Sequence, residues 1–156
     1  MNLLISNLKL NNYKEIDRSI IKKIEVLKLT DNRVNKLRIE EFEEIDLKNE
    51  YVLDNESLVE DFDVDNLCGI IYRGGNHVSN WIEQLDSTTK MYLFRDNLIN
   101  IIDNILRYPN GGDLPTVAMI NGKYYIDEFQ GKHRLTIAKC IGNKKAPVII
   151  NSYIKK

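Results

Sequence analysis

The sequence predicts a single α+β domain with a small mixed sheet. A chain of 156 residues with a hydrophobic share of 43% has the size and apolar content of one domain with one core. Short β-branched runs alternate with stretches of helical periodicity in its second half. Asn121-Gly122 stands between two apolar runs, which is the pattern most typical of a β-hairpin.

Residues 1–66 are expected to form a helical and acidic N-terminal extension that packs on a core formed by residues 67–156. Residues 2–10 alternate loosely, as a first strand would. Apolar residues at helical spacing predict an amphipathic helix from Lys14 to Leu29. Residues 38–65 carry isolated apolar side chains among carboxylates, which predicts short helical or strand pieces without clear ends.

In the middle of the chain, Leu67 to Arg73 is an apolar run that ends at Gly74-Gly75, as a buried strand before a tight turn would. Val78 to Leu85 suits a short helix. Asp86, Ser87 and Thr88 offer N-cap side chains for a long helix that continues to Arg107. The expected apolar face of that helix contains Met91, Leu93, Phe94, Leu98, Ile101, Ile102, Ile105 and Leu106.

The C-terminal part is expected to be a strand–turn–strand–helix–strand unit. Thr116 to Ile120 and Lys123 to Phe129 are the two strands of the hairpin. Arg134 to Ile141 is the helix, closed by Gly142. Ala146 to Ile150, with three consecutive β-branched residues, suits a strand inside a sheet.

Charge is segregated along the chain. The net charge is +4 over residues 1–40, −11 over residues 41–89 and +6 over residues 90–156, for a total of −1. Such segregation creates fields of opposite sign where the segments stay apart in space.

The sequence also predicts where in the cell the protein is located. No apolar run is long enough to cross a membrane, and the first residues lack the pattern of a signal peptide. Cys68 and Cys140 have no metal-ligand spacing and no CxxC arrangement, which is typical of a cytoplasmic protein with two free thiols. Neither His77 nor His133 lies at a metal-ligand spacing, so no protein metal site is expected.

The segment Gly131-Lys132-His133-Arg134 predicts an anion site where a strand turns directly into a helix. Gly131 can adopt the positive φ that such a corner requires. The first helical turn has amide hydrogens without intrahelical partners, and the helix dipole favours a phosphate there. Arg134 can bind an oxyanion through two parallel hydrogen bonds, Lys132 supplies a mobile charge and His133 a further donor.

These residues resemble the ParB/sulfiredoxin superfamily. The resemblance runs over residues 125–150: a strand, a glycine followed by a pair such as Glu-Arg-Arg or His-His-Arg, a helix, a second glycine, and a strand that begins near a proline. Here those elements are Tyr124-Tyr125-Ile126, Gly131 to Arg134, Leu135 to Lys139, Gly142, and Ala146-Pro147-Val148-Ile149-Ile150. The resemblance implies a site for ATP or CTP, with Mg²⁺ on the phosphates. Members act as partition switches, sulfinic-acid reductases, small-molecule kinases or nucleases.

Departures from the family limit what can be carried over. Sulfiredoxins have a cysteine where this chain has Lys132, and Cys140 is expected to be a small buried apolar residue, so sulfinic-acid repair is not expected. Partition proteins continue into DNA-binding and dimerisation domains. This chain ends at Lys156, soon after the resembling segment, so a complete partition protein is not expected. If the protein is an enzyme, the resemblance leaves two possibilities: an NTP-dependent phosphotransferase or NTPase, and a ParB-like nuclease.

Glu128 and His133 are the candidate catalytic residues. Side chains alternate along a strand, so Glu128 shares a face with Gln130, where the family often has an acid. Glu128 could therefore supply a metal-facing carboxylate or a base, although it could equally lie on a solvated strand face. Arg73, in the stretch Tyr72-Arg73-Gly74-Gly75-Asn76-His77, is a further candidate for phosphate binding. The alternative for that stretch is a plain surface turn.

The acidic segment, residues 40–65, supports a different hypothesis. It contains twelve carboxylates and one lysine. Its ordinary interpretation is a solvated surface. The alternative is a non-catalytic phage or mobile-element protein, an inhibitor or nucleic-acid mimic, whose acidic segment docks on a basic protein. Direct DNA binding by the basic C-terminal part is a weaker alternative, because the net charge is −1.

Overall fold

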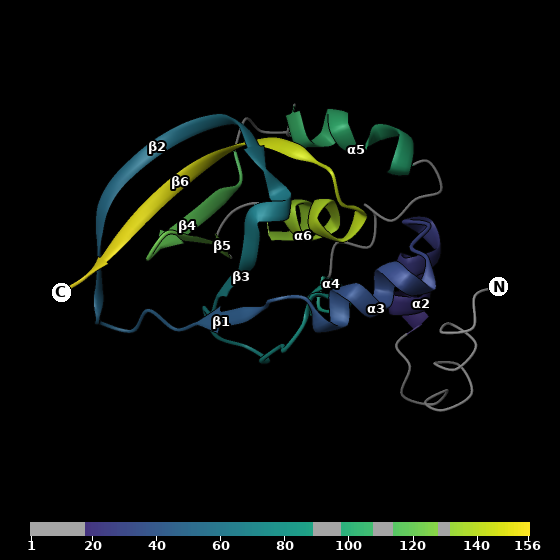
Figure 1. Ribbon diagram of the computed structural model, residues 1–156, viewed down its shortest axis with the longest axis horizontal. Coiled ribbons are helices and arrows are strands. Elements are labelled where there is room, and N and C mark those ends of the chain that lie inside the picture. The colour runs from purple at the N-terminus through teal and green to yellow at the C-terminus, as the bar shows by residue number, and fades with distance from the viewer. Residues whose placement is uncertain (1–17, 89–97, 108–113, 128–131) are drawn as a thin grey trace.

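The computed structural model describes residues 18–88, 98–107, 114–127 and 132–156. The fold is α+β, as expected, with a six-stranded mixed sheet in the order β1-β3-β5-β4-β6-β2. In Figure 1 the strands occupy the left of the molecule and the helices the right. No described helix is long and apolar enough to cross a membrane.

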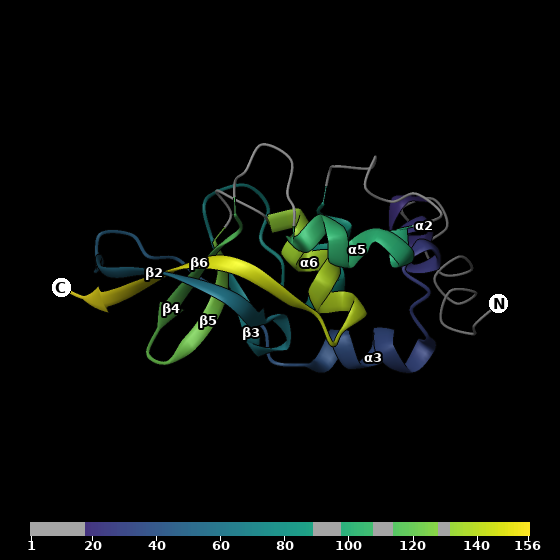
Figure 2. The same cartoon turned by 90° about the horizontal axis from the view of Figure 1, so that it is seen from above.

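The described α-helices all pack on one face of the sheet. They are α2 (Arg18–Val26), α3 (Asp31–Ile39), α4 (Trp81–Asp86), α5 (Leu98–Arg107) and α6 (Lys132–Ile141). The large hydrophobic core joins their buried side chains to one face of the strands, including Ile70, Val117, Ile126, Val148 and Ile150. Figure 2 shows the sheet and the helices side by side when the molecule is viewed from above.

The expected hairpin is confirmed in β4 (Thr116–Ile120) and β5 (Lys123–Asp127), which pair antiparallel. Asn121 and Gly122 form its turn with φ values of 53° and 77°. Two positive φ values are the signature of the hairpin turn that Asn-Gly favours, because its twist matches that of the strands. The chain then enters α6 and returns as β6 (Lys145–Lys155), which lies parallel to β4.

The N-terminal part supplies two strands to the same sheet. β1 (Glu43–Ile45) pairs parallel with β3 (Leu67–Ile71), and β2 (Tyr51–Asp63) pairs antiparallel with β6. A short 3-10 helix, η1 (Val64–Asn66), joins β2 to β3. β1 approaches β3 so closely that a Cβ at Gly69 would lie 1.8 Å from the carbonyl oxygen of Glu43. Glycine is therefore required at this point of the β3 strand.

The second face of the sheet carries a smaller apolar cluster. Leu47, Ile71, Ala118, Ile120 and Tyr125 are buried there, with Tyr51 and Tyr153 beside them. The described helices contribute none of these residues, so we call this side the open face of the sheet. It is covered in part by the segment that joins β1 to β2.

Several expected boundaries differ from the structure. Of the three expected N-cap residues, Asp86 and Ser87 instead end α4: Asp86 is its last residue, and Ser87 is the C-cap, whose N–H donates to the carbonyls of Glu83 and Leu85. Residues 89–97 lie outside the described residues, so an N-cap at Thr88 stays a prediction. Only the second half of that expected helix is described, as α5. The helix from Lys14 is described from Arg18 to Val26, and the strand expected at residues 2–10 lies outside the described residues.

Candidate functional site

The helix α6 is the centre of the helical layer. Figure 1 shows it between α5 and α4 and against the strands. Its residues from Leu135 to Cys140 are all at most 3% exposed. A helix buried in this way has a dipole that solvent screens poorly, so the charges at its two ends matter more than on a surface helix.

The C-terminus of α6 is capped by a cation from α3. Arg33 donates from Nε to the carbonyl oxygen of Cys140 at 2.8 Å and from Nη2 to that of Lys139 at 2.6 Å. Gly142 follows in the left-handed conformation, with φ of 87°, as the sequence predicts for the end of this helix. The positive guanidinium therefore lies at the negative end of the helix dipole.

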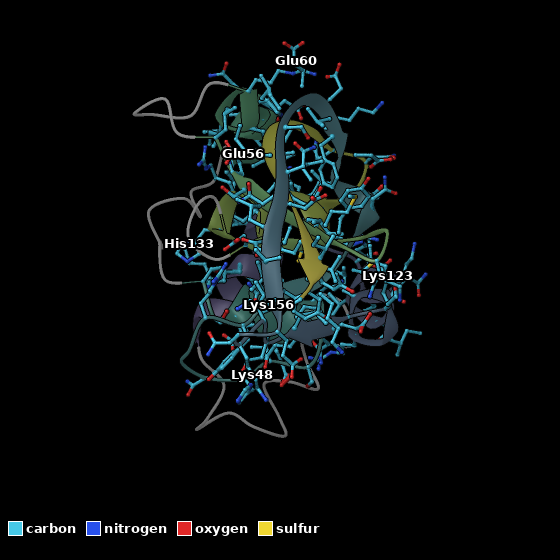
Figure 3. All side chains as sticks on the ribbon, turned by 90° about the vertical axis from the view of Figure 1, so that its left-hand side faces the viewer. Lys48, Glu56, Glu60, Lys123, His133 and Lys156 are labelled. Atoms are coloured by element: carbon cyan, nitrogen blue, oxygen red, sulfur yellow. The ribbon has the colours of Figure 1, made fainter. Side chains whose placement is uncertain are left out.

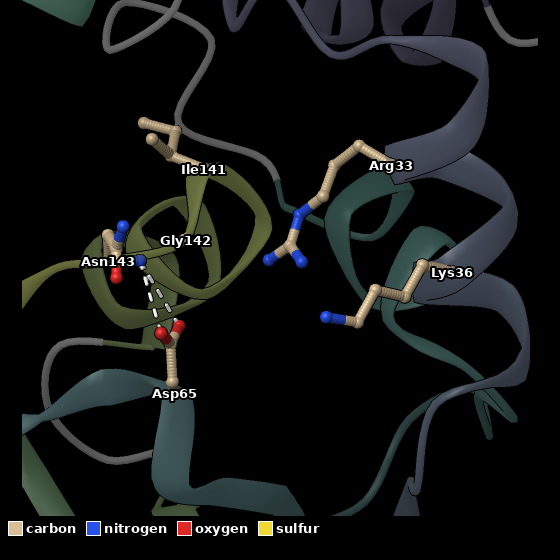
Figure 4. Close-up of a pocket in the computed structure, with 6 residues that line it drawn as sticks. All are labelled: Arg33, Lys36, Asp65, Ile141, Gly142 and Asn143. Atoms are coloured by element: carbon tan, nitrogen blue, oxygen red, sulfur yellow. Dashed lines mark hydrogen bonds between the residues drawn. The ribbon is translucent and has the colours of Figure 1, made fainter.

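A pocket of about 280 Å³ opens beside this cap, lined by Arg33, Lys36, Asp65, Ile141, Gly142 and Asn143 (Figure 4). The carboxylate of Asp65 accepts from the backbone N–H of Asn143 at 3.2 and 3.3 Å. The pocket thus contains the groups that close the α6–β6 turn. We interpret it as part of the helix cap, which was not expected from the sequence.

The N-terminus of α6 is the expected anion corner. The helix begins at Lys132, immediately after the 128–131 segment, and the side chains of His133 and Arg134 are half-buried. Figure 3 shows His133 at one rim of the molecule, on the side opposite Lys123, which begins β5. Glu128 and Gly131 lie outside the described residues, as does the side chain of Lys132, so their expected roles stay predictions.

Arg73 follows β3 at the end of the sheet where β5 also ends. Strands β3 and β5 are parallel, and Ile71 pairs with Asp127, so both chains leave the sheet at the same edge. The guanidinium of Arg73 donates from Nε to Oδ1 of Asp127 at 3.3 Å and from Nη2 to Oδ2 at 3.0 Å. Asp127 is the last residue of β5 and precedes the 128–131 segment that leads to α6. The structure therefore places Arg73 against Asp127, at the end of the strand from which the chain continues towards α6.

The ion pair is asymmetric in its exposure. The side chain of Asp127 is 2% exposed, whereas that of Arg73 is 27% exposed. Burial disfavours the charged form of Arg73, but its hydrogen bonds to Asp127, the charge of Asp127 and the side chain of Tyr153 outweigh that effect and raise the pKa of Arg73. Arg73 is thus a fixed cation that is partly neutralised by its partner.

The Tyr72–His77 stretch packs against β1. The ring of Tyr72 stacks on that of His77 at 4.2 Å between centroids, and its hydroxyl donates to the carbonyl oxygen of Gly75. Glu44 of β1 pairs with Nδ1 of His77 and accepts from the backbone N–H of Val78 at 3.0 Å. His77 is 72% exposed, in agreement with the expected surface turn.

Sequence reasoning did not assign Asp127 and Glu44 to these contacts. Asp127 is buried and accepts two hydrogen bonds from Arg73, so the structure makes it the partner of that residue. The contact between Arg73 and Asp127 could be predicted only from the parallel pairing of β3 with β5, because that pairing places the two residues at the same end of the sheet. Glu44 could be found only once β1 was known to lie beside β3.

The two cysteines behave as the sequence predicts. Both are free thiols, and Cys140 is fully buried in α6. Burial raises the pKa of Cys140 to about 12, so its thiol stays protonated and unreactive at neutral pH. Among the described residues, no group of three or more His, Cys, Asp and Glu side chains could hold a metal ion.

Comparison with known proteins identifies no relative of this chain: no family model, curated protein or solved structure matches it.

Proposed function

We propose that the chain binds the phosphate groups of a nucleotide, ATP or CTP, at the corner formed by Gly131, Lys132, His133 and Arg134. The observation that carries this proposal is the environment of α6. The helix is buried from Leu135 to Cys140, and its C-terminus is capped by Arg33. Its sequence begins with three successive basic residues, Lys132, His133 and Arg134, of which the last two have half-buried side chains. An anion bound at the N-terminus would interact favourably with the positive end of the helix dipole, as Arg33 does with the negative end at the C-terminus.

Each residue of the corner has a role in this proposal. Arg134 grips a phosphate with two N–H groups, Lys132 adds a mobile charge, and the N–H groups of the first turn donate to the remaining oxygens. Asp127 fixes the orientation of Arg73, which adds positive potential at the same edge of the sheet. Mg²⁺ would enter with the nucleotide, bound to its phosphates.

Phosphoryl transfer or NTP hydrolysis is the reaction that suits such a site. Its transition state spreads negative charge over the phosphoryl oxygens, and fixed cations stabilise that charge. Glu128 and His133 are the groups that we assign to proton transfer from the attacking hydroxyl or water. Their roles extend the binding proposal and can fail while nucleotide binding holds.

Calorimetric titration tests the binding proposal. ATP, CTP and GTP, each with Mg²⁺, are titrated into the full chain, and binding of at least one at millimolar concentration or below is expected. Arg134→Ala should weaken binding roughly ten- to a hundredfold, because a hydrogen bond to a charged group contributes about 1.5–3 kcal/mol. Lys156→Ala, at the end of the chain, should leave the affinity unchanged. No binding of any of the three nucleotides to the unaltered chain would refute the proposal.

A second candidate function is docking of the acidic segment, residues 40–65, on a basic protein. The observation that favours it is the position of β2, which holds five of the twelve carboxylates and is exposed along most of its length. Capture of partners from a lysate tests it: charge reversal within the segment should abolish capture. An unchanged set of partners would count against this function.

A further inference from the structure

The strand β2 forms one edge of the sheet and has β6 as its sole sheet neighbour in the described part of the chain. It has 13 residues, which correspond to about 43 Å at the usual rise per residue. The outer side of an edge strand carries backbone N–H and C=O groups that can pair with another extended chain. Figure 1 shows β2 as a long curved ribbon along the outside of β6.

The side chains of β2 make this edge strongly acidic. The strand contains five carboxylates and no Lys or Arg. Asp61 pairs with Arg107 at 3.6 Å, but none of the ion pairs within the described residues includes Asp54, Glu56 or Glu60. In Figure 3, Glu56 and Glu60 lie towards the end of the molecule opposite Lys48.

Two apolar side chains accompany the carboxylates. Leu53 is 48% exposed and Leu58 is 56% exposed. Their partners in β6, Tyr153 and Ile149, alternate along the strand with residues of the core, so Leu53 and Leu58 lie on the open face. Glu56, opposite Asn151, lies on that face as well. An incoming strand would thus meet both apolar contacts and carboxylates.

A second copy of this chain does not suit the β2 edge. Antiparallel pairing of two β2 strands around Ser57 would place Asp54 opposite Glu60, and parallel pairing in register would place each carboxylate opposite its own copy. Like charges directly opposite each other destabilise a strand pair. The same carboxylates favour a cationic strand, whose side chains would neutralise them.

We propose that β2 is a docking edge for an extended, basic segment of another protein, which adds to the sheet as a strand beside β2. This inference rests on the second candidate function and gives it a binding mode. Backbone hydrogen bonds supply affinity, and basic side chains that meet Asp54, Glu56 and Glu60 supply selectivity.

The test uses a nine-residue probe peptide in which Lys alternates with Val and Thr, labelled for fluorescence polarisation and titrated with the full chain at low salt. The first control peptide carries N-methyl groups on the backbone of its central residues, which keeps the charge but removes the N–H donors. The second has Glu in place of each Lys. The protein variant Asp54→Asn/Glu56→Gln/Glu60→Gln keeps the strand but removes three carboxylates that make no ion pair with other described residues. The triple variant Glu25→Gln/Asp31→Asn/Asp103→Asn, elsewhere on the surface, is the charge-matched control.

The inference expects the Lys peptide to bind, with roughly tenfold weaker binding to the triple variant, as the loss of three exposed ion pairs would cause. The N-methylated peptide should bind the unaltered chain at least as weakly as the Lys peptide binds the triple variant. The Glu peptide should not bind, and the surface control variant should bind the Lys peptide as the unaltered chain does. Equal binding of the methylated and unmethylated peptides would overturn strand pairing while leaving charge-driven docking intact. Absence of binding by the Lys peptide at millimolar concentration would overturn the docking edge itself.

Discussion

The guanidinium of Arg73 and the carboxylate of Asp127 meet through two hydrogen bonds, of 3.3 and 3.0 Å, where the parallel strands β3 and β5 end. The pair links two segments that are 54 residues apart in the sequence. It fixes a cation at the edge of the sheet from which the chain continues to α6.

Replacing Asp127 with Asn should lower the free energy of unfolding by about 1.5–3 kcal/mol, because hydrogen bonds to charged groups are lost at a site that is 2% exposed. Urea unfolding monitored by circular dichroism measures the change. Asp54→Asn, on the exposed β2 strand, is the matched control and should change stability by less than about 0.5 kcal/mol. Equal effects of the two substitutions would contradict a structural role for the pair.

Gly69→Ala should disrupt the pairing of β1 with β3. The added Cβ would lie 1.8 Å from the carbonyl oxygen of Glu43, so one backbone must move. We expect a loss of about 3 kcal/mol, the upper end of the cost of overpacking. Gly75→Ala is the control: Gly75 has a φ of 84°, and a Cβ added there would meet no atom within 4 Å, so the substitution should cost only about 1 kcal/mol. A loss no larger for Gly69→Ala would contradict the close approach of the strands.

Lys23 should prove to be a structural lysine. It is fully buried, and its ammonium donates to the carbonyls of Leu85, Asp86 and Thr88 at 3.1, 3.0 and 2.7 Å. Lys23→Met leaves these carbonyls without that donor, so we expect a loss of about 3 kcal/mol or more in urea unfolding. Lys22→Met, at the exposed neighbouring position of the same helix, should be close to neutral. A similar small effect of both would show that the carbonyls find other donors.

Tyr125 should make the fold less stable at alkaline pH. Burial, together with the charge and hydrogen bond of Glu43, raises the pKa of Tyr125 from 10.0 to about 12. The folded chain therefore holds the phenol proton more tightly than the unfolded chain, and stability falls as pH rises from about 10 to about 12. Tyr125→Phe should lose less stability than the unaltered chain between pH 10 and pH 12, as measured by urea midpoints. Tyr124→Phe is the control, and an equal pH dependence in both variants would contradict the assignment.

The C-terminal half of the fold could be predicted because its determinants are local. The Asn121-Gly122 turn, the apolar periodicity before Gly142 and the β-branched run at Val148 act within a few residues, and the structure has β4, β5, α6 and β6 there. The strand β2 could not be bounded in this way. It is exposed on both faces, and its register shifts between Leu53 and Asn55 and again between Val59 and Phe62, which interrupts alternation.

Long-range contacts account for the other differences. The chain after α4 offers cap residues for a new helix at Asp86, but the ammonium of Lys23, 63 residues away, binds the carbonyl of Asp86 at the end of α4. The helix α3 has only two buried apolar residues, Val34 and Leu37, so its periodicity was too weak to predict. At the candidate site, the sequence context of Arg73 predicts a role in phosphate binding, which stays a prediction. Its partner Asp127 could be found only from the pairing of β3 with β5.

The position of a bound nucleotide tests the central claim most directly. In a titration of ¹⁵N-labelled chain with ATP or CTP and Mg²⁺, the account predicts that the largest amide shift changes fall on residues 132–135, at the N-terminus of α6. The same experiment with Arg134→Ala should lose these changes. Lys36→Ala, a substitution on α3 beside the C-terminus of α6, should keep them. Changes centred on Arg33, Lys36 and Asn143, or no changes at millimolar nucleotide, would contradict a phosphate site at the Gly131–Arg134 corner.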